Sequence, residues 1–381
     1  MKHYNYIFAG AGLASLMTAY RMAVSGNFKE KSILLIDNDA KKTNDRTWCF
    51  WEKNEGFTDE IVYRKWSTAL FANNKKRIDL EFNGYQYKMI RGADFYNFVF
   101  AELQKHPNIE FVQQKVVDFV DSGFNVLVKT EAENYTASKL FNNIYNPSLA
   151  ASQKKYPVLQ QHFIGWHVKT TEPVFNAEKP VFMDFSIPQK GNTRFMYVLP
   201  FSNKEAIVEY TLFSADLLAD AEYEQAIEDY LKNLGISSYE IIAEERGSIP
   251  MTSYPFWKHN TKNILNIGTA GGWTKASTGY TFKNADRLSA KLVQFLSTGS
   301  DFTKFHKKSR FWFYDLLLLD ILDRTNQNGS QIFSAMFKTG KAAPIFKFLD
   351  EETTFSEDIG VISKCPKGLF LASLFRRSVN L

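Results

Sequence analysis

The chain begins with a stretch that decides its fold: YNYIFAGAGLASLMTAYRMAVSGNFKEKSILLID, residues 4–37. A β-prone run over residues 4–9 ends abruptly at Gly10. The apolar residues that follow recur at helical spacing until Gly26. Residues 32–36 form a nearly all-apolar run, typical of a parallel strand buried on both faces, and Asp37 stands at its end. The pattern predicts a β-α-β unit.

The turn inside this unit has the form of a dinucleotide fingerprint. Gly10 permits a tight turn, and Gly12 lets backbone N–H groups approach a pyrophosphate at the helix N-terminus. Asp37 follows at the spacing expected for a carboxylate that binds a ribose. A glycine turn in a sheet without a ligand is the alternative. The cofactor-binding residues expected here are Gly10, Gly12, Leu13, Ala14, Ser15 and Asp37.

NAD and FAD share this fingerprint, and a second glycine-rich segment favours FAD. Residues 263–267 predict a short apolar strand, followed by Gly268, Thr269 and Gly272 within the run GTAGG. Many flavoproteins carry a strand, a glycine turn with an acid, and a helix whose N-terminus faces the flavin. Thr269 stands where the acid is usual, but residues 284–295 have the spacing of the expected helix.

Composition excludes several classes of protein. The chain has 381 residues, of which 45% are hydrophobic and 23% charged, as in a folded globular protein of about two domains. Its net charge of +5 suits an anionic membrane surface and is too weak and scattered to indicate nucleic acid. The two cysteines and six histidines show no metal-ligand spacing. The 34 phenylalanines indicate either an aromatic-lined cavity or codon bias.

We expect an α/β fold with a discontinuous FAD-binding Rossmann-like domain, of the glutathione-reductase or hydroxylase type. This domain is predicted over residues 1–66, 91–155 and 255–300. A β-rich substrate domain over 67–90 and 156–254 is predicted from alternating apolar runs. The remainder, 301–381, is expected to be a helical C-terminal region.

Two acids stand alone among apolar residues, and an aromatic cluster follows the second strand. Glu209 lies in a predicted strand over 206–213, where burial would raise its proton affinity as a general acid requires. Asp184 lies in a similar aromatic run. A solvent-facing acid on an edge strand is the alternative for both. Arg46 could contact a flavin, and Trp48 or Trp51 could line an apolar slot or belong to the core.

Taken in order, the motifs resemble those of the flavin-binding lycopene cyclases of carotenoid biosynthesis. The resemblance extends from residue 4 to about residue 285. Tyr210 departs from it, because many members have a second acid there. The segments that carry the resemblance are 9–16 (AGAGLASL), 45–50 (DRTWCF), 161–167 (QHFIGWH), 183–185 (MDF), 195–202 (FMYVLPFS), 207–211 (IVEYT), 247–251 (GSIPM), 268–272 (GTAGG) and 277–280 (STGY).

The resemblance implies an isomerase that cyclises the ψ-ends of lycopene to β-ionone rings without net redox change. Glu209 would be the initiating acid, with Asp184 and Arg46 in supporting or cofactor-orienting roles. Reduced FAD would stabilise the carbocation, and NAD(P)H would keep it reduced. The residues expected to line the substrate are Trp48, Trp51, Tyr197, Phe201 and Tyr280.

A cytoplasmic protein attached peripherally to the inner face of the membrane is expected, because the substrate partitions into bilayers. Lysines and arginines flank apolar residues 369–371 and 374–375, as in a short basic amphipathic segment. A terminal helix packed on the protein is the alternative. The rival functions are an FAD-dependent polyprenoid reductase or hydroxylase and a non-catalytic flavin- or lipid-binding protein.

Overall fold

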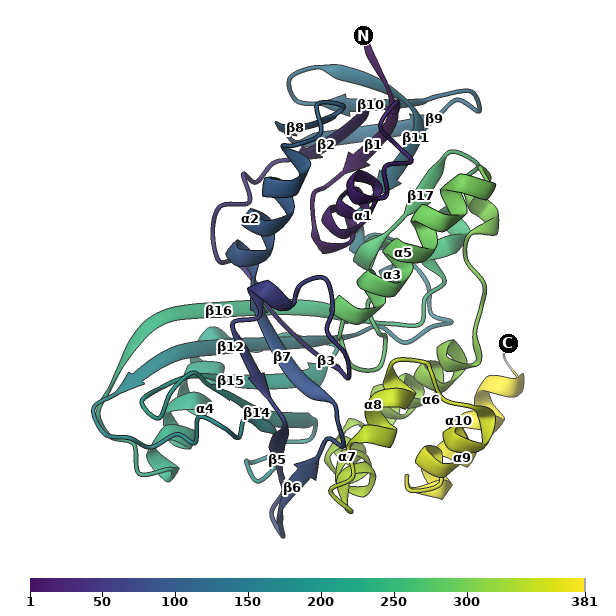
Figure 1. The fold of residues 1–381 in the computed structure, drawn as a ribbon. Coiled ribbons are helices and arrows are strands. Elements are labelled where there is room, and N and C mark those ends of the chain that lie inside the picture. The colour runs from purple at the N-terminus through teal and green to yellow at the C-terminus, as the bar shows by residue number, and fades with distance from the viewer. Residues whose placement is uncertain (380–381) are drawn as a thin grey trace.

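The computed structural model describes residues 1–379, and its N-terminal half is built on a mainly parallel sheet (Figure 1). The strands run in the order β8-β2-β1-β11-β10-β9, and β17 pairs with β11. Their bounds are β1 Lys2–Ala9, β2 Ile33–Asp37, β8 Ile109–Gln113, β9 Val116–Asp121, β10 Val126–Thr130, β11 Asn134–Asn142 and β17 Ile264–Asn266.

The predicted β-α-β unit forms the centre of this sheet. β1 pairs in parallel with β2 on one side and with β11 on the other. Helix α1 (Leu13–Ser25) connects β1 to β2 and packs against α2 (Gly92–Leu103) and α5 (Phe282–Thr298). Because the apolar side of α1 is buried, strand and helix share one core. The fold prediction is confirmed here.

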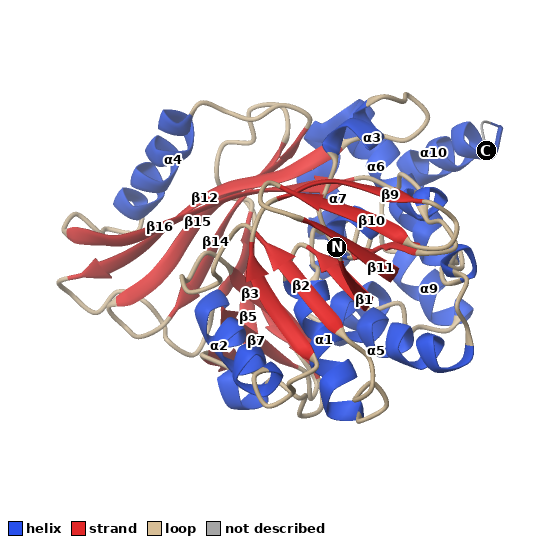
Figure 2. Cartoon of the chain, turned by 90° about the horizontal axis from the view of Figure 1, so that it is seen from above, coloured by secondary structure: helices blue, strands red, loops and turns tan. Residues whose placement is uncertain are grey.

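A second sheet, strongly bent, lies beneath the first (Figure 1). Its strand order is β16-β12-β15-β14-β13-β5-β6, and β12 pairs antiparallel with both β15 and β16. Helix α4 (Asp220–Asn233) covers the outer face of this sheet, as Figure 2 shows, which leaves the inner face for the interior. The strand bounds are β5 Thr68–Ala72, β6 Arg77–Glu81, β12 Leu159–Thr170, β13 Val181–Asp184, β14 Thr193–Pro200, β15 Glu205–Ser214 and β16 Tyr239–Met251.

A small sheet joins the two larger ones. It has the order β3-β7-β4, with β3 at Thr47–Glu52, β4 at Arg64–Trp66 and β7 at Gln86–Arg91. The predicted domain boundary at residues 90–91 lies within β7, and the one at 66–67 lies between the end of β4 and the start of β5. The short helices that precede α5 are η1 Asp59–Ile61, α3 Pro147–Ala151, η2 Phe256–His259 and η3 Gly268–Gly271.

The C-terminal region is helical in its described part; residues 380 and 381 of the predicted range lie outside it. These helices pack beside the bent sheet and close the far end of the interior (Figure 1). Their apolar side chains join those of the sheet in one large cluster rich in phenylalanine. The bounds are η4 Phe302–Lys304, α6 Arg310–Thr325, η5 Asn326–Asn328, α7 Gly329–Phe337, α8 Ala343–Leu349, α9 Phe355–Ile362 and α10 Lys367–Val379.

Candidate active site

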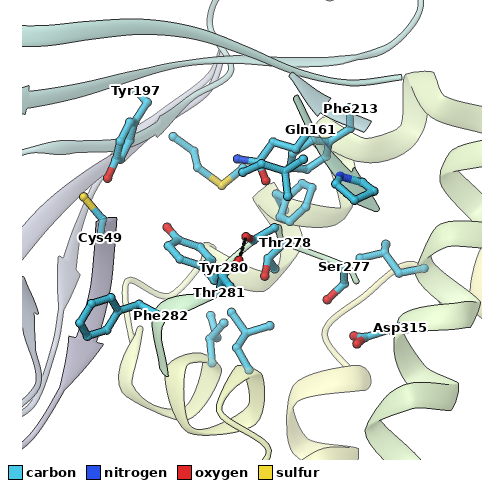
Figure 3. A pocket seen from close by; sticks show the side chains of 18 of the residues that line it. Cys49, Gln161, Tyr197, Phe213, Ser277, Thr278, Tyr280, Thr281, Phe282 and Asp315 are labelled. Carbon is cyan, nitrogen blue, oxygen red and sulfur yellow. Dashed lines mark hydrogen bonds between the residues drawn. The ribbon is translucent and has the colours of Figure 1, made fainter. Parts of the chain in front are cut away.

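A cavity of about 910 Å³ extends from the glycine turns of the first sheet to the C-terminal helices. The inner face of the bent sheet forms one wall, the segment over residues 277–282 forms another, and helices α6 to α10 complete it. Figure 3 shows Cys49 and Tyr197 on one side of this space, Ser277 and Asp315 on the other, and Tyr280 between them. Most of the lining is apolar or aromatic, so a hydrophobic molecule fits its chemistry.

The first glycine turn closes one end of the cavity with backbone groups. Gly10 adopts a φ of +89°, which favours glycine, and Ser15 Oγ donates to its carbonyl at 2.6 Å. Asp37 accepts the N–H of Ala11 at 2.6 Å and so ties the end of β2 to the turn. Gly12 precedes α1 without a side-chain cap, which leaves N–H groups of the helix end available for an anion.

The second glycine turn meets the first around one side chain, Asn143. A Cβ at Gly12 would lie 2.5 Å from Asn143 Nδ2, and a Cβ at Gly268 would collide with Asn143 Oδ1. The N–H of Asn143 donates to the carbonyl of Ala9 at 2.8 Å, which fixes the residue beyond the end of β11. Sequence reasoning missed Asn143, which directly follows the last residue of β11.

Some residues of the two glycine turns line the cavity, and others lie behind the lining. Leu13, Ala14, Gly268 and Thr269 line it together with Gly12. The hydroxyl of Thr269 lies 3.1 Å from that of Thr274. Gly272, with a φ of +71°, ends the 3₁₀ turn η3 outside the lining. Gly10, Ser15 and Asp37 shape the first turn without lining the cavity.

Cationic side chains stand beside this end of the cavity. Lys41 Nζ lies 3.4 Å from Asp37 Oδ1, and the half-exposed guanidinium of Arg46 lies 3.9 Å from Asp45 Oδ2. Lys41 and Arg46 both line the cavity, so they can neutralise a bound anion. Trp48 also lines it and packs edge-on against Phe95 at a centroid distance of 5.3 Å.

Glu209, on β15, lines the cavity. The part of its side chain that is accessible faces this internal space. Burial raises the pKa of Glu209 to about 8. The Thr211 hydroxyl donates to Glu209 Oε1 and opposes this increase, whereas the negative charge of Glu245 adds to the increase. The carboxyl is therefore protonated at neutral pH, as a general acid must be.

A second acid, Glu245, shares this face of the sheet. Gly165 of β12 pairs with Glu209 on one side and with Glu245 of β16 on the other, so one row crosses the three strands. Thr47 holds Glu245 with its N–H at 3.0 Å and its hydroxyl at 2.6 Å. Burial raises the pKa of Glu245, while the two hydrogen bonds from Thr47 oppose that increase. Sequence reasoning missed Glu245.

Three tyrosines form a hydrogen-bonded group in the cavity wall. The hydroxyl of Tyr87 lies 2.5 Å from that of Tyr197 and 3.0 Å from that of Tyr280. Burial raises the pKa of Tyr87 and of Tyr197 well above the ordinary tyrosine value. Burial also raises the pKa of the adjacent Cys49 thiol to about 12, so all three groups stay neutral. These three tyrosines line the cavity and bring aromatic rings to it without adding charge.

Several expected site residues lie away from the cavity lining. Asp184 is buried and accepts hydrogen bonds from the N–H and hydroxyl of Ser186 and from the hydroxyl of Tyr230. Trp51 stacks on Phe346 and donates to Asp350 at 2.9 Å. Phe201 packs edge-on against Tyr63 and His167. Of the expected substrate-lining residues, those that reach the cavity are Trp48, Tyr197 and Tyr280.

The described residues contain neither a metal-binding cluster nor a helix that could span a membrane. Within residues 1–379, no group of three or more His, Cys, Asp or Glu side chains is placed to hold a metal ion. Over the same range, no helix combines the length and the apolar character needed to cross a bilayer.

The fold is shared with solved structures that include a flavoprotein/dehydrogenase and flavin-dependent halogenases. A flavoprotein/dehydrogenase from Cytophaga hutchinsonii superposes with a TM-score of 0.65 at 12% identity and covers 98% of this chain and 99% of its own. The halogenase PltM in complex with FAD superposes with a TM-score of 0.56 at 12% identity and covers 91% of this chain and 78% of its own. These likenesses establish the fold.

The chain belongs to the lycopene cyclase family. The sequence model of that family, described as "Lycopene cyclase protein", matches residues 5–375. A lycopene beta-cyclase from Pantoea ananas is 26% identical over 299 residues, which are 76% of this chain and 74% of that protein. The match includes the helical C-terminal region, beyond the residues that carried the resemblance in the sequence.

Proposed function

We propose that this chain is a lycopene beta-cyclase, an isomerase that closes the ψ-ends of lycopene into β-ionone rings. The observation that carries the proposal is Glu209, a buried carboxyl in the wall of a large hydrophobic cavity. Lycopene is a hydrocarbon and offers nothing to hydrogen-bond, so an enzyme must act on it by proton transfer and charge stabilisation. A carboxylic acid that stays protonated at neutral pH can supply the first proton.

The residues of the two glycine turns fit a dinucleotide-bound flavin. The uncapped N-terminus of α1 can receive the pyrophosphate, with Lys41 and Arg46 beside it. Other lining residues at this end are Leu13, Ala14, Gly268 and Thr269. The conformation of the turns depends on residues outside the lining, which are Gly10, Ser15, Asp37 and Gly272. When bound, reduced FAD would supply an electron-rich neighbour that stabilises positive charge on the substrate. NAD(P)H is the proposed source of its electrons.

Aromatic side chains would hold the positive charge after protonation. Tyr197 and Tyr280 line the same cavity as Glu209, and their hydroxyls both bond to that of Tyr87. This fixes the rings, whose faces attract a cation through their quadrupoles. Trp48 lies at the cofactor end of the cavity. Asp184 would support the sheet through Ser186 and Tyr230 and would not contact substrate.

The cavity also fits a substrate that arrives from a membrane. Phe355, Ile359, Leu371 and Leu374 are exposed on the surface and at the same time line the cavity, so it opens between α9 and α10. We call these four residues the α9–α10 mouth. Phe375 beside it is 74% exposed, Lys364 lies between the two helices, and Lys367 is the first residue of α10. We propose peripheral attachment of this mouth to the inner face of the cytoplasmic membrane, strengthened by basic residues and weakened by salt.

Expression in cells that accumulate lycopene, followed by pigment analysis, tests the function. A cyclase forms γ-carotene or β-carotene, and Glu209→Gln abolishes ring formation while the variant still folds and retains flavin. A reductase or hydroxylase would instead consume one NAD(P)H for each product molecule, whereas a cyclase needs reductant only in catalytic amount. Absence of any new pigment from the wild-type chain with bound flavin would favour a non-catalytic flavin- or lipid-binding protein.

A further inference from the structure

A row of three residues on the cavity face of the bent sheet places two carboxyl side chains on either side of a glycine. Glu209, Gly165 and Glu245 are consecutive partners across β15, β12 and β16. Neighbouring strands are about 4.8 Å apart, so the backbones of the two acids are separated by about 10 Å. Because Gly165 has no side chain, nothing from β12 fills the space between the two acids.

The two acids differ in their hydrogen-bond partners. Within residues 1–379, the Thr211 hydroxyl, two residues along the same strand, is the single donor to the Glu209 carboxyl. Glu245 accepts from both the N–H and the hydroxyl of Thr47, which comes from β3 on a different sheet. Two donors favour the ionised form of a carboxyl more than one donor does. Burial raises the pKa of both carboxyls, but the two hydrogen bonds from Thr47 oppose this increase at Glu245, which makes Glu245 the better proton acceptor of the pair.

We propose that Glu245 is the base that removes the ring proton after Glu209 has donated the initiating proton. This inference rests on the proposed cyclase function. Glu209 gives its proton to C2 of the ψ-end; the electron pair of the C1=C2 bond forms the new C–H bond and leaves the positive charge on C1. The pair of the C5=C6 bond then closes C1 to C6 and moves the charge to C5. Glu245 takes the proton from C6, and the released pair restores the C5=C6 double bond.

The proton balance closes within the site. After one turn, Glu209 is ionised and Glu245 is protonated, so transfer of one proton from Glu245 to Glu209 across Gly165 restores the starting state. Nothing is oxidised or reduced. The position of the base also determines the ring type: loss of the C6 proton gives a β-ring, whereas loss from C4 gives an ε-ring and loss from the C5 methyl group gives a γ-ring.

Replacement of the acid by its amide tests the assignment on purified, flavin-loaded protein with lycopene. Glu245→Gln is expected to lower kcat by about 100-fold, the usual contribution of a positioned base, with little change in KM. The remaining product is expected to contain ε- or γ-rings, because other bases then remove protons from C4 or the methyl group. Thr47→Val keeps the acid but removes one donor, so it is expected to lower kcat less and to shift the ring types in the same direction.

Glu244→Gln is the matched control, because Glu244 is exposed, pairs with Arg246 and lies outside the cavity. It should behave as wild type. Unchanged rate and ring types in Glu245→Gln would overturn the proposal. A lower rate with unchanged ring types would also overturn it, if Glu245→Asp does not restore the rate. If Glu245→Gln fails to fold, unchanged ring types in Thr47→Val overturn it. Failure of the wild-type protein to form any ring would instead refute the cyclase function.

Discussion

A Cβ placed on Gly165 would lie 3.3 Å from the Cβ of Glu209. The same Cβ would lie 3.4 Å from Glu209 Cγ, so a methyl group here would press on the side chain whose carboxyl faces the cavity. Gly165→Ala is therefore expected to lower cyclisation by tenfold or more by displacing Glu209, and to cost about 1 kcal/mol of stability through overpacking. Pigment formation and denaturant unfolding measure the two effects.

Gly360→Ala is the control for this substitution. Gly360 lies within α9, and a Cβ there would meet nothing within 4 Å. Alanine should therefore leave activity unchanged and stabilise the helix slightly. Equal activity of Gly165→Ala and Gly360→Ala would show that a methyl group at residue 165 does not displace Glu209.

Protonation of Glu209 predicts an upper limit to the pH range of activity. Because burial raises its pKa to about 8, the acid form is present below that pH and is lost above it. The rate of ring formation should therefore fall as the pH rises through about 8. A rate profile between pH 6 and 10 measures this, and a flat profile across that range would contradict the role of Glu209 as the proton donor.

The same carboxyl also gives stability a pH dependence. The folded-state pKa is about 8 against 4.5 for an ordinary glutamate, so the unfolded chain releases the proton first and stability falls between those two values. The glutamine in Glu209→Gln does not titrate. The free energy of unfolding of this variant should therefore exceed that of the wild type by about 3 kcal/mol at pH 7, and the difference should vanish towards pH 4. Urea unfolding at several pH values measures it.

Local patterns in the sequence were sufficient to predict the core of the fold. The β-α-β unit could be recognised because strand, glycine turn, helix and Asp37 are adjacent in the chain. The strands around Glu209 were found because apolar runs bounded by turn residues are local signals too. The large hydrophobic cavity agrees with one of the two explanations offered for the many phenylalanines.

Residues whose partners are distant in sequence could not be found in the same way. Glu245 lies between two exposed charged residues, Glu244 and Arg246, and its role depends on pairing with β12. Asn143 depends on two glycine turns that are more than 200 residues apart. Asp184 and Met183 illustrate a further limit, since Met183 lines the cavity and Asp184 does not. Which face of a strand is internal is decided by tertiary packing.

A buried ion cluster links the cavity wall to the C-terminal helices and should be important for stability. Lys275 Nζ lies 3.0 Å from Asp315 and 3.1 Å from Glu351. Lys275→Met leaves two enclosed carboxylates without this partner, so it is expected to cost about 3 kcal/mol or more. Lys347→Ala breaks a solvent-exposed pair with Glu357 and should cost less than about 1 kcal/mol. Denaturant unfolding compares them, and equal losses would contradict the buried role.

The α9–α10 mouth predicts a specific loss of membrane binding. Phe375 is exposed beside the mouth and does not line the cavity, so Phe375→Ser should reduce co-sedimentation with phosphatidylglycerol vesicles severalfold. Phe124→Ser changes a side chain that is 91% exposed in the turn between β9 and β10, remote in the fold from the mouth. That control should bind vesicles as the wild type does. Equal binding by all three proteins would exclude this surface as the membrane contact.

Gly268 offers a test of the flavin end that is separate from catalysis. Its φ of +57° favours glycine, and a Cβ there would collide with Asn143 Oδ1, so Gly268→Ala must displace the residue at which the two glycine turns meet. Gly84→Ala places the same side chain at a φ of +87° with nothing within 4 Å, and therefore reports the backbone strain alone. Flavin absorbance per protein after purification should fall severalfold in Gly268→Ala and stay near the wild-type value in Gly84→Ala. Similar flavin content in Gly268→Ala and the wild type would place the cofactor elsewhere.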